Sequence, residues 1–403
     1  MRIVYLLSYF ELVGGQEFFL ARQQAKQGHE VFVVGSDLFY PVPRIRERYL
    51  MDGFGQEWLK RRPGRSKYEG LTIIRLPTVF HYQDFILVRG VKEVLVELRP
   101  DVVFGHEPRT IVPILGARYK QQFGYLYYLD SHDFFHTIQN HQWWQRWLRY
   151  AEYFWWRRWF VDYGLRQADR IIAVAEECRK FLVKRHGVPN DRIDYLPLGV
   201  ETDFFQYDET ARREIRQKLG GGSRDIILIF AGYMFRRKAL ESLIDLIAQV
   251  RDISLRLVFA GEGPADYLDE LKSYAQKKGV AERVHFTGFL SRQEVTRYYA
   301  AADIGIWPGN NSLVIMEAMA CRLPIIMADM QLAHLVSHGN GFKVPYADVG
   351  LMKEVIKKLA TNPELRREMG LASEKASLEH YSYASLARQV SSWMEADLAK
   401  LKR

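Results

Sequence analysis

The feature that most constrains this chain is a short apolar run followed by glycines, a helical segment and a second apolar run. Residues 2–8 (RIVYLLS) predict a buried strand, and the pair Gly14-Gly15 follows it. The next residues carry apolar side chains at helical spacing until Gly28-His29, after which residues 30–35 (EVFVVG) predict a second strand. A strand, glycine turn, helix and strand in this order predict a parallel βαβ unit and an α/β fold.

The same pattern recurs in both halves of the chain. In the first half, further strands are expected at residues 71–76, 101–105, 125–130 and 170–174. After a glycine-rich break at 220–223, the second half repeats the pattern with strands expected at 226–231, 255–260, 283–287, 304–307 and 324–327. We therefore expect two successive α/β domains joined near residues 197–205, with ligands bound outside the carboxyl ends of the strands.

Composition narrows the class of protein. Of 403 residues, 48% are hydrophobic and 26% charged, which is typical of a globular chain and excludes general disorder. The longest apolar stretch, residues 226–235, is about half of the roughly 20 residues that a membrane span requires. Two cysteines exclude a disulfide scaffold. The N-terminus lacks the pattern of a signal peptide, so we expect a cytoplasmic protein, with attachment to the inner membrane face left open.

The net charge of +9 favours phosphate-bearing partners, which are nucleic acid, anionic lipid or a nucleotide-type substrate. Gly14 and Gly15 predict a turn whose amides approach an anion, and an ordinary tight turn is the alternative. Arg236, Arg237 and Lys238 follow the strand at 226–231, where a phosphate would bind. A solvated basic loop is the alternative there.

Three further residues are candidates for a ligand site. Glu262 lies between two glycines after the strand at 255–260, where a simple turn is the alternative. Glu317 begins a helical stretch, where a carboxylate either favours the helix dipole or accepts bonds from ribose hydroxyls. His132 follows residues 125–130, and it is either a structural histidine or a catalytic or sugar-binding one.

Together these motifs resemble the retaining, nucleotide-sugar-dependent glycosyltransferases of family 4, which have the GT-B architecture. The resemblance runs over nearly the whole chain, through VGGQEFFLARQQAKQGHEVFVVG, RIIAVAEECRKFLVKRHG, IDYLPLGVETDFF, LVFAGEGP, VHFTGFLSRQEVTRYYAAADIGIWP and MEAMACRLPII. It implies two Rossmann-like domains facing a central cleft, with acceptor binding in residues 1–198 and donor binding in residues 199–380. Residues 381–403 would form a helix that packs back on the first domain.

The resemblance also implies roles for single residues. His132 would lie beside the transferred sugar, and Lys238 would bind the diphosphate of the donor. Glu317 would hold the ribose. The remaining donor-binding residues would be Gly14, Gly15, Arg237, Glu262, Phe289, Leu290, Ser312 and Leu313. The reaction would transfer a hexosyl or N-acetylhexosaminyl group with retention, without metal or cofactor, to a lipid-linked or surface-glycan saccharide.

The chain departs from the family pattern at three positions. Gly309 replaces a sugar-binding glutamate eight residues before Glu317, and Tyr233 replaces an arginine five residues before Lys238. Arg322 replaces a glycine. Arg236 or Arg237 could replace the lost arginine, and Asn310 or Asn311 could recognise sugar hydroxyls. These losses leave an alternative function, a glycosyltransferase-like partner subunit that binds nucleotide or glycan without turnover.

Residues 143–159 concentrate six of the nine tryptophans together with arginines. On a helical projection the two residue types segregate to opposite faces, which is typical of a helix at a membrane interface. An ordinary domain helix that buries its tryptophans is the alternative. Nucleic acid is the least favoured partner, because no recognised nucleic-acid motif accompanies the segment, and we expect none to be bound.

Overall fold

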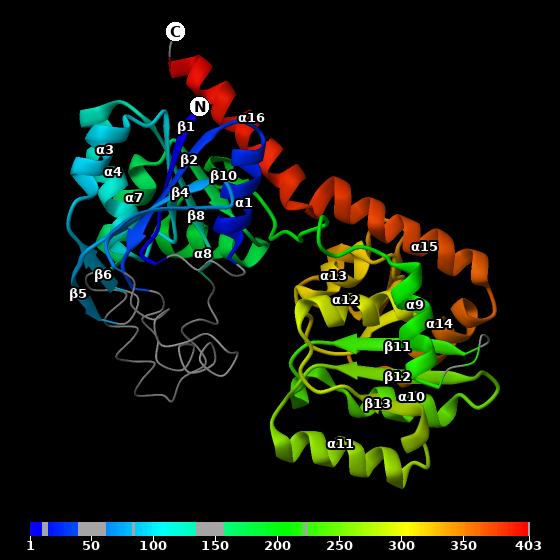
Figure 1. Cartoon of the computed structure of the whole chain (residues 1–403). Coiled ribbons are helices and arrows are strands. Elements are labelled where there is room, and N and C mark those ends of the chain that lie inside the picture. The colour runs from blue at the N-terminus through cyan, green and yellow to red at the C-terminus, as the bar shows by residue number, and fades with distance from the viewer. Residues whose placement is uncertain are drawn as a thin grey trace. The chain divides into compact units, whose positions relative to one another are not determined.

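The computed structural model describes residues 1–9, 15–38, 62–82, 85–133, 157–220, 222 and 225–401 (Figure 1). The chain divides into two compact units. The first unit comprises Met1–Leu198 and Tyr383–Arg403, and the second comprises Gly199–Ser382.

The first unit is built on an eight-stranded sheet in the order β10-β9-β8-β7-β1-β2-β4-β3. All neighbouring strands are parallel except β3, which runs antiparallel to β4. The strands are β1 (Arg2–Leu6), β2 (Glu30–Ser36), β3 (Gly64–Tyr68), β4 (Leu71–Leu76), β7 (Val102–His106), β8 (Leu126–Ser131), β9 (Arg170–Ala173) and β10 (Ile193–Tyr195). A separate antiparallel pair is formed by β5 (Thr78–Tyr82) and β6 (Phe85–Val88).

Helices cover both faces of this sheet because side chains alternate along each strand. Ile3 and Tyr5 of β1 join the core on the side of α1 (Gln16–Lys26) and α16 (Tyr383–Leu401). Val4 and Leu6 join the core on the other side. That side is covered by α3 (Val91–Leu98), α4 (Ile111–Phe123), α7 (Arg158–Gln167) and α8 (Glu176–His186).

The C-terminal helix α16 is held to the first unit by buried contacts. The rings of Phe19 on α1 and Tyr383 on α16 stack at 4.7 Å. Asp397 on α16 accepts hydrogen bonds from the Tyr128 hydroxyl at 2.6 Å and from the Arg170 guanidinium at 2.9 and 3.1 Å. Leu386, Ala387, Val390 and Met394 are almost completely buried in the same core.

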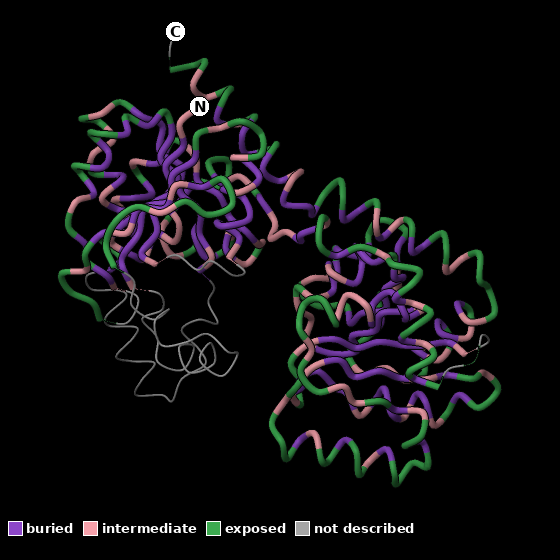
Figure 2. Tube along the Cα trace, in the orientation of Figure 1, coloured by how far each residue is buried: buried purple, intermediate pink, exposed green. Residues whose placement is uncertain are grey.

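The second unit contains a six-stranded, fully parallel sheet in the order β13-β12-β11-β14-β15-β16. The strands are β11 (Ile226–Ala231), β12 (Leu255–Ala260), β13 (Val284–Phe286), β14 (Ile304–Trp307), β15 (Ile325–Ala328) and β16 (Gly341–Val344). The helices are α9 (Glu209–Lys218), α10 (Glu241–Gln249), α11 (Ala265–Lys277), α12 (Arg292–Ala301), α13 (Val314–Ala320), α14 (Val349–Ala360) and α15 (Pro363–Ala376). Figure 2 shows the strands buried and the outer helical faces exposed.

The α/β prediction is confirmed, and the predicted apolar strands lie within one or two residues of the observed ones. The sequence did not predict β3, β5, β6, β10 and β16. These strands are short, and β3 and β5 are largely exposed. β3, β5, β10 and β16 lack the continuous apolar run that marks a buried strand, whereas β6 (FILV) has a run of only four residues.

Candidate functional site

Four loops follow the carboxyl ends of neighbouring strands in the second unit. They come after β11, β12, β13 and β14 and carry most of the residues that the sequence singled out. Backbone hydrogen bonds join them. The Met234 amide donates to the Glu262 carbonyl at 2.7 Å, and the Gly261 amide donates to the Gly288 carbonyl at 3.1 Å. The loops therefore form one continuous edge of backbone and side-chain groups.

Glycine is required where two of these loops meet. Gly261 has φ of +139°, and a Cβ there would lie 2.3 Å from the Gly232 carbonyl oxygen. A Cβ at Gly263 would lie 2.3 Å from the Met234 carbonyl oxygen. The two glycines that flank Glu262 thus let the loop after β12 approach the loop after β11. Glu262 itself is exposed.

Lys238 lies in a 3-10 turn, Arg236–Lys238, at the end of the loop after β11. Its side chain is buried, and the Nζ atom donates to the Asn310 carbonyl at 2.6 Å. The same ammonium lies 5.4 Å from the centre of the Phe235 ring. Burial lowers the pKa of Lys238 to about 8, because a charged ammonium loses hydration there. Within the described residues, the Lys238 ammonium donates to one carbonyl oxygen, so it has further donor hydrogens for an anion.

Gly309 places its loop directly against this lysine. A Cβ at Gly309 would lie 2.6 Å from both the Arg237 carbonyl oxygen and the Lys238 carbonyl carbon. The next residue, Asn310, donates its amide to the Arg237 carbonyl at 2.9 Å. The glycine therefore does more than omit a carboxylate, since its missing side chain lets residues 308–311 bind the backbone of the lysine turn.

Glu317 lies on α13, which follows β14. Its Oε2 accepts a hydrogen bond from the Tyr299 hydroxyl of α12 at 3.2 Å. Burial raises the pKa of Glu317 to about 7, and the Tyr299 hydrogen bond and the Arg292 charge only partly oppose this effect. Within the described residues, Tyr299 is the hydrogen-bond donor to the Glu317 carboxylate. Hydrogen bonds from two hydroxyl groups of a ligand would therefore stabilise the buried carboxylate.

The remaining predicted residues of this edge differ in exposure. Phe289 is 60% exposed and Leu313 is 43% exposed, whereas Leu290 is half-buried. The Ser312 hydroxyl is buried and has no hydrogen-bond partner among the described residues. These residues lie on the loops after β13 and β14, in the same continuous edge as Lys238.

The structure separates the two arginines that could replace the residue at Tyr233. Arg236 pairs with Glu270 of α11 at 2.7 Å and lies 5.3 Å from the centre of the Tyr267 ring. Arg237 is exposed, and its guanidinium lies 5.8 Å from the centre of the Phe235 ring. Arg237 is therefore the better candidate for contacting an anion beside Lys238.

In the first unit, His132 follows β8 and contacts His106 and Asp130, two residues that the sequence did not single out. Its ring packs edge-on against His106 with centroids 4.7 Å apart, and its Nε2 lies 3.5 Å from an Asp130 oxygen. The His106 Nδ1 lies 2.9 Å from the other Asp130 oxygen, and the His106 Nε2 lies 3.6 Å from Glu17. His106 and Asp130 are aligned partners at the carboxyl ends of adjacent strands β7 and β8, which is the signal that could have found them.

The contacts between His106, Asp130 and Glu17 shift the pKa values of His106 and Asp130. Burial alone would lower the pKa of His106, but Asp130 and Glu17 outweigh it and raise that pKa to about 10. Burial would raise the pKa of Asp130, but His106 holds it well below its usual range. His106, Asp130 and His132 bring three ligand atoms within 4.8 Å of one another. Asp130 contacts both histidines, and its contact with the His132 ring can orient that ring.

Two other predictions meet the limits of the described residues. Gly15 is the N-cap of α1, while Gly14 lies outside the described residues. Most of the segment 143–159 also lies outside them. Of its last three residues, Arg157 is buried and Trp159 is 64% exposed. Within the described part of the chain, no helix combines the length and the apolar character needed to cross a membrane.

Two family models match the chain on either side of the junction between the units. The model described as Glycosyltransferase Family 4 matches residues 17–204, and the model described as Glycosyl transferases group 1 matches residues 211–376. The chain belongs to the family-4 glycosyltransferases. The resemblance seen in the sequence motifs is therefore confirmed.

Curated proteins that are similar to this chain match part of it. Alpha-D-kanosaminyltransferase from Streptomyces kanamyceticus is 25% identical over 57% of this chain and 60% of that protein. A GDP-mannose-dependent alpha-(1-6)-phosphatidylinositol monomannoside mannosyltransferase from Mycolicibacterium smegmatis is 28% identical over 57% of this chain and 64% of that protein. The chain thus matches less than two thirds of the length of these curated relatives.

Solved structures confirm the fold of this chain. HepE from Anabaena, in complex with UDP, has a TM-score of 0.69 at 16% identity and covers 98% of this chain and 100% of that chain. Sucrose-phosphate synthase from Thermosynechococcus elongatus has a TM-score of 0.65 at 18% identity and covers 99% of this chain and 100% of that chain. The predicted GT-B architecture is confirmed.

Proposed function

We propose that this protein transfers a hexosyl or N-acetylhexosaminyl group from a nucleoside diphosphate to an acceptor hydroxyl with retention. The observation that carries the proposal is the presence of a buried cation, Lys238, in the loop after β11 and of a half-buried carboxylate, Glu317, on α13 after the neighbouring strand β14. A nucleotide sugar has the matching groups, because its diphosphate is anionic and its ribose carries two neighbouring hydroxyls.

In this proposal Lys238 stabilises the departing diphosphate. The bond between the sugar C1 and the diphosphate oxygen breaks, a bond from C1 to the acceptor oxygen forms, and the acceptor proton ends on the diphosphate. The ammonium and nearby backbone amides would stabilise the negative charge that develops on the departing diphosphate oxygen. Preorganised groups of this kind lower the activation free energy of the transfer. We propose that these groups act without a metal, and that His132 lies beside the transferred sugar.

Retention follows from attack on the face that the diphosphate leaves. Two successive inversions would require a carboxylate nucleophile near C1. The loop 308–311 carries Pro308, Gly309, Asn310 and Asn311, and none of them is a nucleophile of that kind. The Asn311 Oδ1 atom is buried without a partner among the described residues, so this amide has a free acceptor for a sugar hydroxyl. The proposal is thus same-face substitution, with amides in place of the missing glutamate.

The acceptor is proposed to be a lipid-linked or surface-glycan saccharide. The support is the mannosyltransferase from Mycolicibacterium smegmatis, whose name gives a phosphatidylinositol mannoside as its substrate. We further propose that residues 143–159 bind an anionic membrane surface near such an acceptor. Flotation with anionic liposomes tests this, and a variant with Trp143, Trp147 and Trp155 changed to Ala should float less than the wild type.

The test of the transfer reaction compares Lys238→Ala with Arg236→Ala in assays with a panel of nucleotide sugars and saccharide acceptors. We expect Lys238→Ala to lose about 10²–10³-fold in transfer with its fold intact, as for removal of one preorganised charge-stabilising group. Arg236→Ala is the matched control, because Arg236 shares the turn but pairs with Glu270. Equal activity in both variants would contradict the role of Lys238.

Gly309 and Tyr233 favour a second candidate, a partner subunit that binds a nucleotide or glycan without turnover. Both positions lack a charged side chain that the resembled family uses on the donor. Calorimetry with nucleoside diphosphates, followed by measurement of sugar release, separates the two functions. Tight binding with neither transfer nor donor hydrolysis, across the whole panel, would favour the binding subunit.

A further inference from the structure

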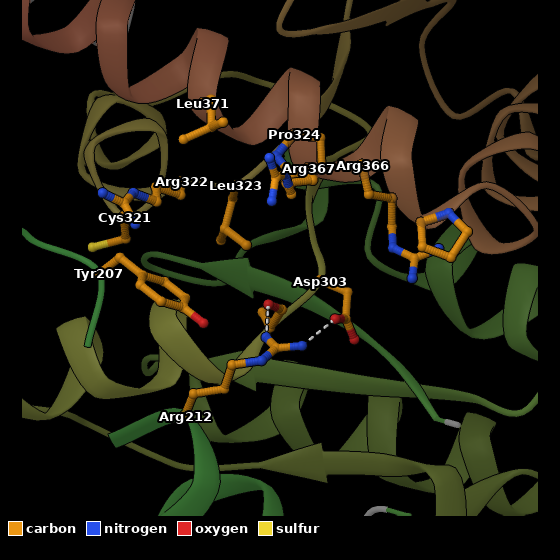
Figure 3. Close-up of a pocket in the computed structure, with 12 residues that line it drawn as sticks. Tyr207, Arg212, Asp303, Cys321, Arg322, Leu323, Pro324, Arg366, Arg367 and Leu371 are labelled. Atoms are coloured by element: carbon orange, nitrogen blue, oxygen red, sulfur yellow. Dashed lines mark hydrogen bonds and ion pairs between the residues drawn. The ribbon is translucent and has the colours of Figure 1, made fainter. Parts of the chain in front are cut away.

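A pocket of about 570 Å³ lies in the second unit at the amino ends of the strands, away from the loops that carry Lys238 and Glu317. Asp303 directly precedes β14, and Leu323 and Pro324 directly precede β15. Figure 3 shows side chains from α9 and from α15 converging on this space. Its volume falls in the range of small-molecule sites, about 300–1,000 Å³.

The charges that line the pocket are unbalanced. Arg212, Arg322, Arg366 and Arg367 line it, and Asp303 is the one acidic residue among its described lining residues. Asp303 is already paired, because its Oδ1 accepts from Arg212 at 2.6 Å and its Oδ2 accepts from Arg216 at 2.9 Å and from the Ile227 amide at 2.8 Å. Its single negative charge is therefore shared between two arginines, and the lining of the pocket keeps an excess of positive charge.

The two arginines of α15 have no acidic partner among the described residues. Arg366 donates to the Ala360 carbonyl at 2.9 Å and to the Leu359 carbonyl. Burial lowers the pKa of Arg366, the Asp303 charge opposes this effect, and the nearby Arg212 and Arg216 charges add to it. Arg367 is exposed, and within the described residues its guanidinium makes no hydrogen bond or ion pair. An anion in the pocket would relieve this repulsion.

Arg322 lines the pocket from a left-handed backbone position just after the end of α13. Its φ is +64°, in the left-handed region where a residue other than glycine is disfavoured. Its guanidinium lies 5.3 Å from the centre of the Tyr207 ring, and its Nε donates to Glu374 at 2.9 Å. Arg322 thus lies beside the aromatic ring of Tyr207 at the edge of the pocket.

We propose that this pocket binds a small phosphate-bearing molecule at a site separate from that of the donor. Arginine guanidinium groups suit phosphate because they donate in a planar fork. Tyr207, Leu323 and Leu371 offer an apolar surface to the body of the molecule. Since this site is separate from Lys238, its occupancy does not depend on the proposed transfer reaction.

The test measures calorimetric binding of inorganic pyrophosphate and of glucose 6-phosphate to the full chain at low salt. The background variant is Lys238→Ala, which removes the main cation of the other edge. We expect at least one probe to bind saturably, with a stoichiometry near one molecule per chain. Tighter binding of pyrophosphate would identify a free phosphate as the ligand class, and tighter binding of glucose 6-phosphate would identify a phosphate ester. Adding Arg367→Gln should weaken that binding about tenfold, as expected for losing a hydrogen bond to a charged group.

Arg322→Gly provides the second test, because glycine accepts the left-handed backbone without strain. This change should weaken the probe about tenfold without lowering the melting temperature, so loss of folding cannot explain the result. Arg213→Gln is the matched control, since Arg213 is exposed on α9 but does not line the pocket. Absence of binding by both probes, or equal binding by the Arg367, Arg322 and Arg213 variants, would overturn the proposal.

Discussion

At the scale of single residues, Gly309 couples the shape of one loop to the position of the buried lysine. We expect Gly309→Ala to destabilise the second unit by about 1–3 kcal/mol, because a new Cβ would meet rigid backbone atoms at 2.6 Å. The same shift would break the bond from Lys238 to the Asn310 carbonyl, so nucleotide affinity should fall as well. Urea denaturation and calorimetry measure the two effects.

Gly222→Ala is the control for this prediction. Gly222 is exposed, and a Cβ there would have its nearest described neighbour, an Asp225 oxygen, at 3.9 Å. We expect this variant to unfold and to bind nucleotide like the wild type. If Gly309→Ala behaved in the same way, the close approach of the two loops would not matter for stability or binding.

Glu317 connects stability to pH. Its pKa of about 7 lies above the ordinary 4.5, so folding favours the protonated form. The resulting stabilisation is complete below pH 4.5 and is lost as the pH rises through 7. Glu317→Gln stays neutral and should therefore be more stable than the wild type at pH 8, by roughly 1–2 kcal/mol after allowing for the partial exposure of the side chain.

Urea denaturation at pH 5 and pH 8 measures this difference, which should nearly vanish at the lower pH. Glu354→Gln is the control, because Glu354 is exposed on α14 and its change should act equally at both pH values. Glu317→Gln should also bind a nucleoside diphosphate more weakly, since the amide accepts fewer hydrogen bonds. A variant less stable than the wild type at pH 8 would refute the cost of burying this carboxylate.

Lys238 should set the alkaline limit of diphosphate binding. Burial lowers its pKa to about 8, so the ammonium form predominates below pH 8 and declines above it. The association constant for UDP or GDP should therefore fall about tenfold per pH unit above pH 8. Calorimetry from pH 7 to 10 measures this. Arg237→Gln should weaken binding at every pH without moving the point of decline, and a flat wild-type profile would exclude Lys238 from the site.

At the scale of elements, α16 contributes a charged anchor as well as apolar side chains. Asp397 accepts hydrogen bonds from the Tyr128 hydroxyl and the Arg170 guanidinium, and both hydrogen bonds are partly buried. Asp397→Ala should lower the free energy of unfolding of the first unit by about 1–3 kcal/mol, because those donors lose their acceptor. Glu395→Ala, an exposed change on the same helix, should have little effect in the same urea titration. Equal losses would mean that the anchor contributes nothing.

The elements also show what the sequence can predict. Residues 226–231 form an uninterrupted apolar run and were predicted as the strand that the structure contains. Residues 64–68 (GRSKY) have no such run. They form the edge strand β3 because they hydrogen-bond to the neighbouring strand β4. Local pattern therefore identifies strands that are buried on both faces, and it misses those that tertiary pairing creates.

The candidate site divides in the same way. The sequence located Lys238 by its place after a strand and Glu317 by its place early in a helix, and the family resemblance gave both residues their roles. It could not predict the bond between Lys238 and Asn310, which joins residues 72 positions apart. It also could not predict that Arg236 pairs with Glu270 while Arg237 stays exposed, because both look alike in the sequence. Contacts across long sequence separations need the folded chain.

At the scale of the whole molecule, each unit has its own sheet and its own buried core. We expect scanning calorimetry to resolve two transitions, since each core can lose its packing separately. The proposed nucleotide-binding residues lie on the second unit, so UDP or GDP should raise only that transition. At 100 times its dissociation constant, a ligand adds about 2.7 kcal/mol to the unit that binds it.

Two variants assign the transitions to the units. Gly309→Ala should lower the transition that the nucleotide raises, because both act on the second unit. Asp397→Ala should lower the other transition, because its partners Tyr128 and Arg170 belong to the first unit. If the nucleotide instead raised the transition that Asp397→Ala lowers, nucleotide binding would belong to the first unit. A single transition moved by both variants would show that the two cores unfold together.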